Sequence, residues 1–153
     1  MMLKEELRTM YNKFRLHFYT QILSNFENRE ATLTTVESFS IEAIMILGRP
    51  TVAEFAKMMN ISSPNAAYRV NALQKKGYLT KVRSNEDARI YYLEPTERAK
   101  EYFRINTSYL DTVLDRAEER FSSEDYEKFA EYLHIINTEL MPELSIDRFK
   151  KSK

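Results

Sequence analysis

Two short helix-forming segments separated by a tight turn constrain the fold of this chain more than any other feature. The first, "VAEFAKMMN", follows Thr51, which can cap a helix, and its apolar residues share one face. The second, "SSPNAAYRVNALQKKG", opens with a serine cap, has proline in its first turn and closes on Gly77. Asn60 lies between them and tolerates a left-handed backbone. The pattern predicts a helix-turn-helix.

The flanking segments extend this motif on both sides. After Gly77, "YLTKVRS" and "RIYYLEP" alternate as strands do, and "NEDA" between them predicts a turn. Upstream, "TTVESF" opens a helix that Gly48 and Pro50 end. Apolar residues also recur at helical spacing from 3 to 26, from 96 to 121 and from 122 to 140. The expected fold class is mainly α with a small β-hairpin wing.

These elements predict a three-part organisation along 153 residues. Residues 1–33 hold an N-terminal helix, residues 34–95 hold a winged helix-turn-helix, and residues 96–153 hold two C-terminal helices and a tail. The outer helices carry more apolar surface than a winged-helix lobe of roughly 60 residues covers. We therefore expect a homodimer formed by these helices, with a monomer capped by its own helices as the alternative.

Charge is unevenly distributed, although the 23 basic and 23 acidic residues balance over the whole chain. Residues 94–147 are acidic, whereas residues 62–93 carry six cations and two acids. Such a basic segment marks the surface where a polyanion docks. The six cations are Arg69, Lys75, Lys76, Lys81, Arg83 and Arg89.

The second helix of the motif supplies candidates for contact with double-stranded DNA. The N-terminal residues of a helix in the major groove reach base edges, and arginine suits guanine as asparagine suits adenine. The candidates on this helix are Ser62, Ser63, Asn65, Tyr68 and Arg69. Lys75, Lys76, Lys81 and Arg83 are candidates for the phosphate backbone. Some of these have a structural alternative: Ser62 is a helix cap, and Lys75 with Lys76 complements the helix dipole. Tyr68 and Arg69 have no capping role.

The stretch "LQKKGYLTKVRSNEDARIYYLEPTERAKEYF" resembles the MarR-type transcriptional regulators. The resemblance rests on a helix ending Leu73-x-x-x-Gly77, on Asp87-x-Arg89 in the wing and on Thr96 before a long helix. It implies a homodimeric bacterial repressor that binds a pseudo-palindromic operator and is released by a small aromatic or anionic effector. A winged-helix module that binds a protein instead of specific DNA is the alternative from another class.

Asp87 and Arg89 lie two residues apart on the wing, so the carboxylate can hold the guanidinium in one orientation. An arginine held in this way suits the narrow minor groove, as the Asp-x-Arg pattern does in the family. The alternative is a plain hairpin turn, because Asn85, Glu86 and Asp87 are all good turn residues.

The resemblance also implies an effector cleft between the winged helix and the outer helices. Aromatic residues and methionines offer material for it, with ordinary core packing as the alternative. The candidates are Tyr11, Phe14, His17, Phe18, Met45, Met58 and Met59.

Catalysis, cofactors and bound metal are not expected. The chain has no cysteine, and the Glu-x-x-His pair of Glu131 and His134 occurs once where di-iron proteins need two. No glycine-rich phosphate loop or Ser-His-Asp set can be assembled. The charged start "MMLKEELRTMYNKF" lacks the apolar run of a signal peptide, and no segment is long and apolar enough to cross a bilayer. These features predict a cytoplasmic protein.

Overall fold

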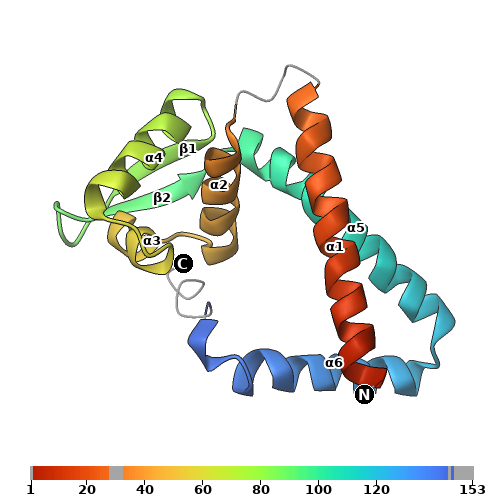
Figure 1. The fold of residues 1–153 in the computed structure, drawn as a ribbon. Coiled ribbons are helices and arrows are strands. Elements are labelled where there is room, and N and C mark those ends of the chain that lie inside the picture. The colour runs from red at the N-terminus through yellow and green to blue at the C-terminus, as the bar shows by residue number, and fades with distance from the viewer. Residues whose placement is uncertain (1, 28–32, 145, 147–153) are drawn as a thin grey trace. The chain divides into compact units, whose positions relative to one another are not determined.

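The computed structural model describes residues 2–27, 33–144 and 146, which form helices and one antiparallel hairpin (Figure 1). This confirms the expected class, mainly α with a small hairpin wing. The predicted tail after Leu144 lies outside the described residues, apart from Ile146. The elements are α1 (Met2–Glu27), α2 (Thr35–Leu47), α3 (Val52–Met58), α4 (Ser63–Lys75), β1 (Leu79–Arg83), β2 (Tyr91–Pro95), α5 (Glu97–Arg120), α6 (Ser123–Glu139) and the 3-10 turn η1 (Pro142–Leu144).

Local capping chemistry sets the starts of α2, α3 and α4. Thr34 and Thr51 each form a capping box with the glutamate three residues later. The Ser62 hydroxyl accepts a hydrogen bond from the Asn65 backbone amide at 3.3 Å. Asn60 has a φ of 52°, the left-handed conformation predicted for the turn between α3 and α4. The helix-turn-helix is therefore present as predicted.

The described residues fall into two compact units. One contains residues 2–24 and 105–144, and the other contains residues 25–27, 33–104 and 146. We call the first the helical unit and the second the winged-helix unit. Because α5 runs from Glu97 to Arg120, its first turns belong to the winged-helix unit and the rest to the helical unit.

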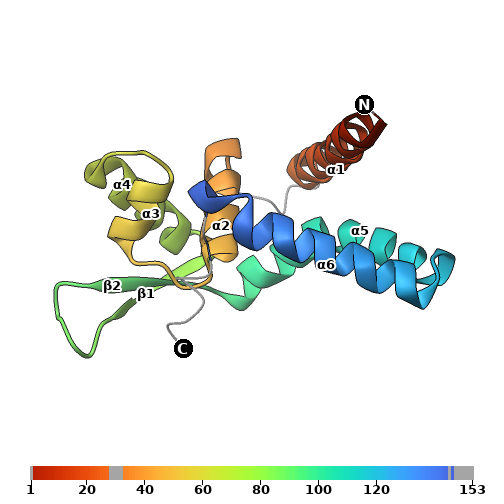
Figure 2. The ribbon, with the colours of Figure 1, turned by 90° about the horizontal axis from the view of Figure 1, so that it is seen from below.

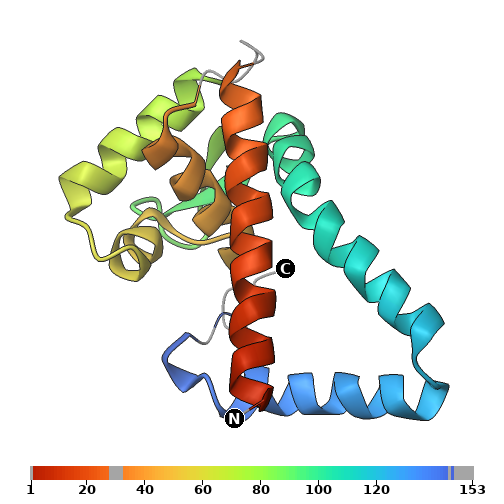
Figure 3. The same cartoon turned by 45° about the vertical axis from the view of Figure 1, so that its right-hand side comes forward.

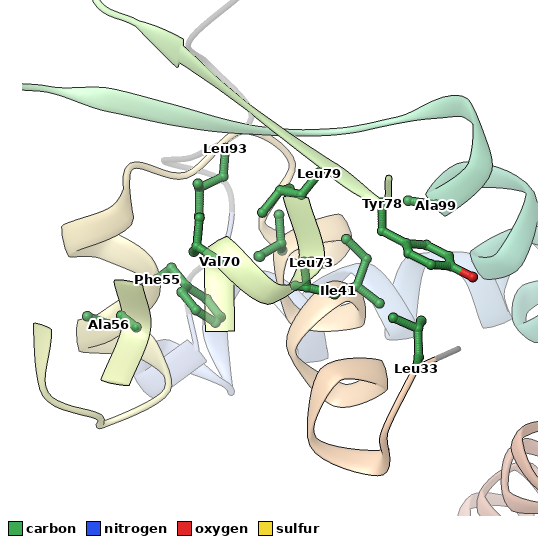
Figure 4. Packing of buried hydrophobic residues seen from close by; sticks show 12 residues of the cluster. Leu33, Ile41, Phe55, Ala56, Val70, Leu73, Tyr78, Leu79, Leu93 and Ala99 are labelled. Atoms are coloured by element: carbon green, nitrogen blue, oxygen red, sulfur yellow. The ribbon is translucent and has the colours of Figure 1, made fainter. Parts of the chain in front are cut away.

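The hydrophobic core lies in the winged-helix unit. Figure 4 shows side chains from α2, α3, α4 and the hairpin meeting in one cluster. Phe55, Ala66, Leu73 and Leu93 are completely buried in it. Its members are Leu33, Ile41, Ile44, Phe55, Ala56, Ala66, Val70, Leu73, Tyr78, Leu79, Leu93 and Ala99. This cluster fixes how α4 is rotated about its axis, and so which of its residues remain exposed.

The hairpin pairs β1 with β2 in antiparallel register, with Lys81 opposite Leu93. Its loop projects beyond α3 (Figure 2). The second strand was predicted from Arg89 but begins at Tyr91. The Arg89 backbone amide donates to the Asp87 carboxylate at 3.0 Å, and the Ile90 amide donates to the Asp87 carbonyl at 3.0 Å. Both amides are thereby used within the loop, so the predicted short turn is a longer loop.

The start of α5 is bound to the end of α4. The Thr96 hydroxyl donates to the Gly77 carbonyl at 2.7 Å, and Arg98 Nη1 donates to the Lys76 carbonyl at 3.0 Å. The Arg98 guanidinium also lies over the Tyr78 ring, 4.6 Å from its centroid. These contacts hold the first turn of α5 against the C-terminal end of α4.

The helical unit differs from the winged-helix unit in the burial of its side chains. It contains most of α1, the later part of α5 and α6, which follows α5 after a sharp turn (Figure 3). No side chain that the structure describes in this unit is buried. Large apolar side chains are instead exposed, among them Leu3, Leu7, Leu23, Tyr132 and Leu140.

Candidate nucleic-acid interface

Helix α4 presents one face to the core and the opposite face to solvent. Ala66, Val70 and Leu73 are buried at helical spacing. Pro64, Ala67, Tyr68, Asn71 and Lys75 are exposed on the other side. Tyr68 is 76% exposed, although it is one of the largest side chains on the helix. We call these five residues the exposed face of α4. No other described part of the winged-helix unit covers this face, so it is accessible to another molecule.

The five candidates on α4 have different positions. Ser62 serves as the cap, and Ser63, Asn65 and Tyr68 are exposed. Arg69 is half-buried, because it follows Tyr68 around the helix toward the core side. Arg69 therefore lies on the flank of the helix rather than at the centre of its exposed face.

Sequence reasoning did not select Pro64, Ala67 and Asn71 as candidates. All three are exposed around Tyr68. The signal that could have found them is helical spacing: Pro64, Tyr68, Asn71 and Lys75 succeed one another at steps of three and four residues. The sequence pattern accounts for Pro64 as a helix-start residue alone.

On the wing, Asp87 holds Arg89 with both carboxylate oxygens. Arg89 Nε donates to Oδ1 at 3.1 Å and Nη2 donates to Oδ2 at 3.0 Å, while the Arg89 amide also donates to Oδ1. The side-chain hydrogen bonds from Arg89 lower the pKa of Asp87, and the same contact raises the pKa of Arg89. The Arg89 side chain is nevertheless 88% exposed. It is therefore a charge held in one orientation and open to solvent.

The other wing cations are exposed as well. Arg83 Nε donates to the Ala88 carbonyl at 2.8 Å, which ties the first strand to the far side of the loop. The Lys81 ammonium lies 5.7 Å from the centroid of the Tyr91 ring, in range of a cation–π interaction. Both side chains keep positive charge along the hairpin.

Lys76 differs from its neighbour Lys75. Its ammonium forms a 2.6 Å ion pair with the Glu37 carboxylate at the start of α2, and the two side chains are only 29% and 13% exposed. Burial by itself would raise the pKa of Glu37, but the hydrogen bonds from Lys76 and Thr34 outweigh it and lower that pKa. Lys76 therefore serves the packing of α4 on α2. The Glu37 pair favours a structural role for Lys76 over the predicted phosphate contact, whereas Lys75 is exposed.

A hollow of about 370 Å³ joins α4 to the wing. Ser63 borders it from α4 and Arg89 from the wing loop, and Val52, Ala53 and Ile90 supply much of its apolar lining. The start of α4 and the wing arginine thus border one continuous surface.

The helical unit contains a second hollow of about 370 Å³. It brings together the four aromatic candidates Tyr11, Phe14, His17 and Phe18. The His17 ring stacks on the Tyr109 ring of α5 with centroids 4.1 Å apart, and Phe14 meets the same ring edge-on at 5.7 Å. Arg15, Thr107 and Leu110 complete the lining.

The three methionine candidates belong to the winged-helix unit. Met45 and Met59 pack against its core, and Met58 is half-buried. The hollow in the helical unit is therefore lined by the four aromatic candidates without the methionines.

The part of the chain that the structure describes offers neither a metal cluster nor a membrane-spanning helix. Among residues 2–27, 33–144 and 146 there is no group of three or more histidine, aspartate and glutamate side chains that could hold a metal ion. Glu131 and His134 are both exposed on α6. Within the same part of the chain, no helix is long and apolar enough to span a bilayer.

The arrangement of α2, α3, α4 and the β1–β2 hairpin defines a winged helix-turn-helix protein. Residues 32–90, which include α2, α3, α4, β1 and the wing loop and end just before β2, match the model of the MarR family. The winged helix-turn-helix of this chain is therefore similar to that of the MarR family.

Solved structures share the fold at low sequence identity. A mutant of MepR from a multidrug-resistant S. aureus clinical isolate has a TM-score of 0.66 at 13% identity, over 91% of this chain and 97% of that chain. A MarR family protein from Bacillus stearothermophilus has a TM-score of 0.64 at 16% identity, over 90% and 92%. FabT of Streptococcus pneumoniae, in complex with DNA, has a TM-score of 0.57 at 18% identity, over 90% and 94%. No curated protein matches the sequence.

Proposed function

We propose that this protein is a sequence-specific regulator that binds a pseudo-palindromic DNA operator as a homodimer and represses transcription. One observation carries the proposal. Ser63 at the start of α4 and the exposed side chain of Arg89 border one hollow, and the exposed face of α4 continues from that start of the helix. A helix in the major groove and an arginine in the adjacent minor groove need this arrangement.

The wing contact depends on how Arg89 is held. An arginine loses rotamer freedom when it enters a groove, and this loss opposes binding. Asp87 already restrains the guanidinium through two side-chain hydrogen bonds, so less freedom remains to be lost. Arg89 acts in the minor groove, where a narrow A·T-rich groove concentrates negative potential.

The remaining cations act on the phosphates. Lys75, Lys81 and Arg83 are exposed in the winged-helix unit. Phosphate contacts release counterions and make the affinity fall steeply as salt rises. They contribute affinity without sequence information.

The exposed apolar side chains of the helical unit support dimerisation. Leu3 is 80% exposed and Leu140 is 66% exposed, and no side chain described in α6 is buried. Long amphipathic helices rarely persist without a packing partner. A second copy of the chain supplies this partner, and the two-fold symmetry of the dimer matches that of the operator.

An effector site in the helical unit is the regulatory part of the proposal. The hollow that Tyr109 lines offers aromatic rings for stacking, and Arg15 on its lining offers positive charge. A flat aromatic anion fits both features. Such a ligand releases DNA only if it binds the DNA-free arrangement of the protein more tightly than the DNA-bound one.

The test is selection of bound fragments from genomic DNA by the intact chain, followed by titration of the selected duplex at several salt concentrations. The proposal expects one enriched pseudo-palindromic sequence, with half-sites about one helical turn apart and affinity that falls as salt rises. A protein-interaction module would enrich no sequence. That outcome would contradict the proposal and favour the alternative class.

A further inference from the structure

The face of α4 that is directed away from the core carries apolar side chains among polar ones in the first half of the helix. Pro64, Ala67 and Tyr68 are exposed there, and Tyr68 is 76% exposed. Exposed apolar area of this kind is unfavourable in water, and it is usual where a partner covers it. Since Ala66 and Val70 on the opposite face hold α4 in the core, rotation of the helix does not remove this exposure.

The charged residues of the same unit indicate the chemical class of the partner. Lys75 follows on the same face, and Lys81, Arg83 and Arg89 are exposed on the hairpin of the same unit. Exposed positive charge in the same unit as a small apolar face complements a polyanion that carries apolar groups. In the major groove of DNA, the apolar group that a side chain meets is the 5-methyl of thymine.

The polar neighbours of Tyr68 point to the same base pair. Asn65 and Asn71 are exposed before and after it on α4. An asparagine amide pairs in bidentate fashion with N6 and N7 of adenine, whereas guanine is read by arginine or lysine. Arg69, the arginine on this helix, is half-buried on its flank, and Lys75 lies in the last turn, away from the N-terminal residues that reach the bases.

We propose that α4 reads A·T base pairs, with the Tyr68 ring and Ala67 packed on thymine methyl groups and the asparagines paired with adenine. This inference rests on the proposed function, and it specifies which bases α4 contacts in the major groove. Tyr68 is thereby a specificity-determining residue that acts through its ring and not through its hydroxyl.

The experiment uses the intact chain and the duplex selected from genomic DNA. Each thymine of the half-sites is replaced in turn by deoxyuridine, which removes one methyl group and leaves the hydrogen-bonding edges unchanged. Covering a methyl is worth about 0.8 kcal/mol, so we expect about four-fold weaker binding at the contacted position. The Tyr68→Ala variant should bind both duplexes equally at that position, while Tyr68→Phe should discriminate as the natural protein does.

The outcomes separate this inference from the proposed function. Salt-dependent, sequence-specific binding with no effect of deoxyuridine at any position would overturn the inference and leave the function standing. A loss in Tyr68→Phe that is equal on all sequences would also overturn it, because the hydroxyl would then contact phosphate. Absence of specific binding to any DNA would overturn both. Thermal unfolding of each variant shows that the fold is retained.

Discussion

The guanidinium of Arg89 donates to both carboxylate oxygens of Asp87, at 3.1 Å and 3.0 Å, while its side chain remains 88% exposed. A contact between two residues so close in sequence adds little to the stability of the fold, since exposed ion pairs are weak. Its effect is to restrain a charge that is otherwise mobile. Loss of the contact should therefore lower the affinity for DNA and leave the free energy of unfolding nearly unchanged.

The first prediction is a double-variant cycle on this pair. Arg89→Ala should weaken operator binding about ten-fold, on the scale of one lost groove contact. Asp87→Ala should weaken it by less, because the arginine remains but is no longer held. In Arg89→Ala, the further change Asp87→Ala should have less than about a two-fold effect. Operator titration measures all four proteins.

A matched control for this cycle is Lys100→Ala, which also removes one exposed cation from the winged-helix unit. Lys100 pairs with Glu97 on α5, away from the wing, so operator affinity should change little. If Asp87→Ala and Arg89→Ala acted independently, the restraint assigned to Asp87 would be wrong.

The second prediction separates two adjacent lysines. Lys75→Ala should reduce the salt dependence of DNA binding by about one phosphate contact, with little effect on stability. Lys76→Ala should instead lower the free energy of unfolding by about 1 kcal/mol, because it breaks the part-buried pair with Glu37. Denaturant unfolding and salt titration together check both. Equal salt slopes for the two variants would contradict the assignment.

A third prediction concerns pH and Glu37. Its pKa is lower in the folded protein than in the unfolded chain, so the unfolded chain binds more protons as the pH falls. The stabilisation is complete at neutral pH and declines as the pH drops from about 5 through the folded pKa. Glu37→Gln should reduce stability at neutral pH and flatten this part of the profile. Unfolding free energies across this range provide the measurement, and parallel profiles for the two proteins would refute the prediction.

A fourth prediction tests the exposed apolar residues of the helical unit. Leu7 is 53% exposed on α1, and Leu7→Glu should convert the proposed dimer into monomer, because a charge cannot be buried without a partner. Light scattering coupled to gel filtration reports the mass. Lys57→Glu, on an exposed position of α3, is the control and should leave the mass unchanged. A dimer that persists in Leu7→Glu would place the interface elsewhere.

The last prediction concerns the hollow in the helical unit. Benzoate should bind more tightly than cyclohexanecarboxylate, because the Tyr109 ring that stacks on His17 favours a flat aromatic ligand. Tyr109→Ala should abolish this preference. Calorimetric titration of both compounds into both proteins provides the comparison. Equal affinity of the natural protein for the two carboxylates would contradict stacking in the hollow.

Much of the fold could be predicted because its signals are local. The caps at Thr34, Thr51 and Ser62 each act within three residues, and the left-handed Asn60 is a property of one residue. The Asp87–Arg89 contact spans two residues, so its presence was expected from the same kind of reasoning. The loop around it is longer than the sequence pattern predicts. The Arg89 amide donates to Asp87 and is therefore not available to the strand ladder.

The sequence by itself determined the order of the elements, their capped starts and the position of the Asp87–Arg89 pair, because interactions between near neighbours specify all of these. Only the tertiary structure decided which charged side chains of α4 and its C-cap are exposed for contact with another molecule. Lys76 is engaged by Glu37, which lies 39 residues earlier, and Arg69 is half-buried because core packing sets the rotation of α4. The same rotation places Tyr68 at the centre of the exposed face, since Ala66, Val70 and Leu73 take the opposite side.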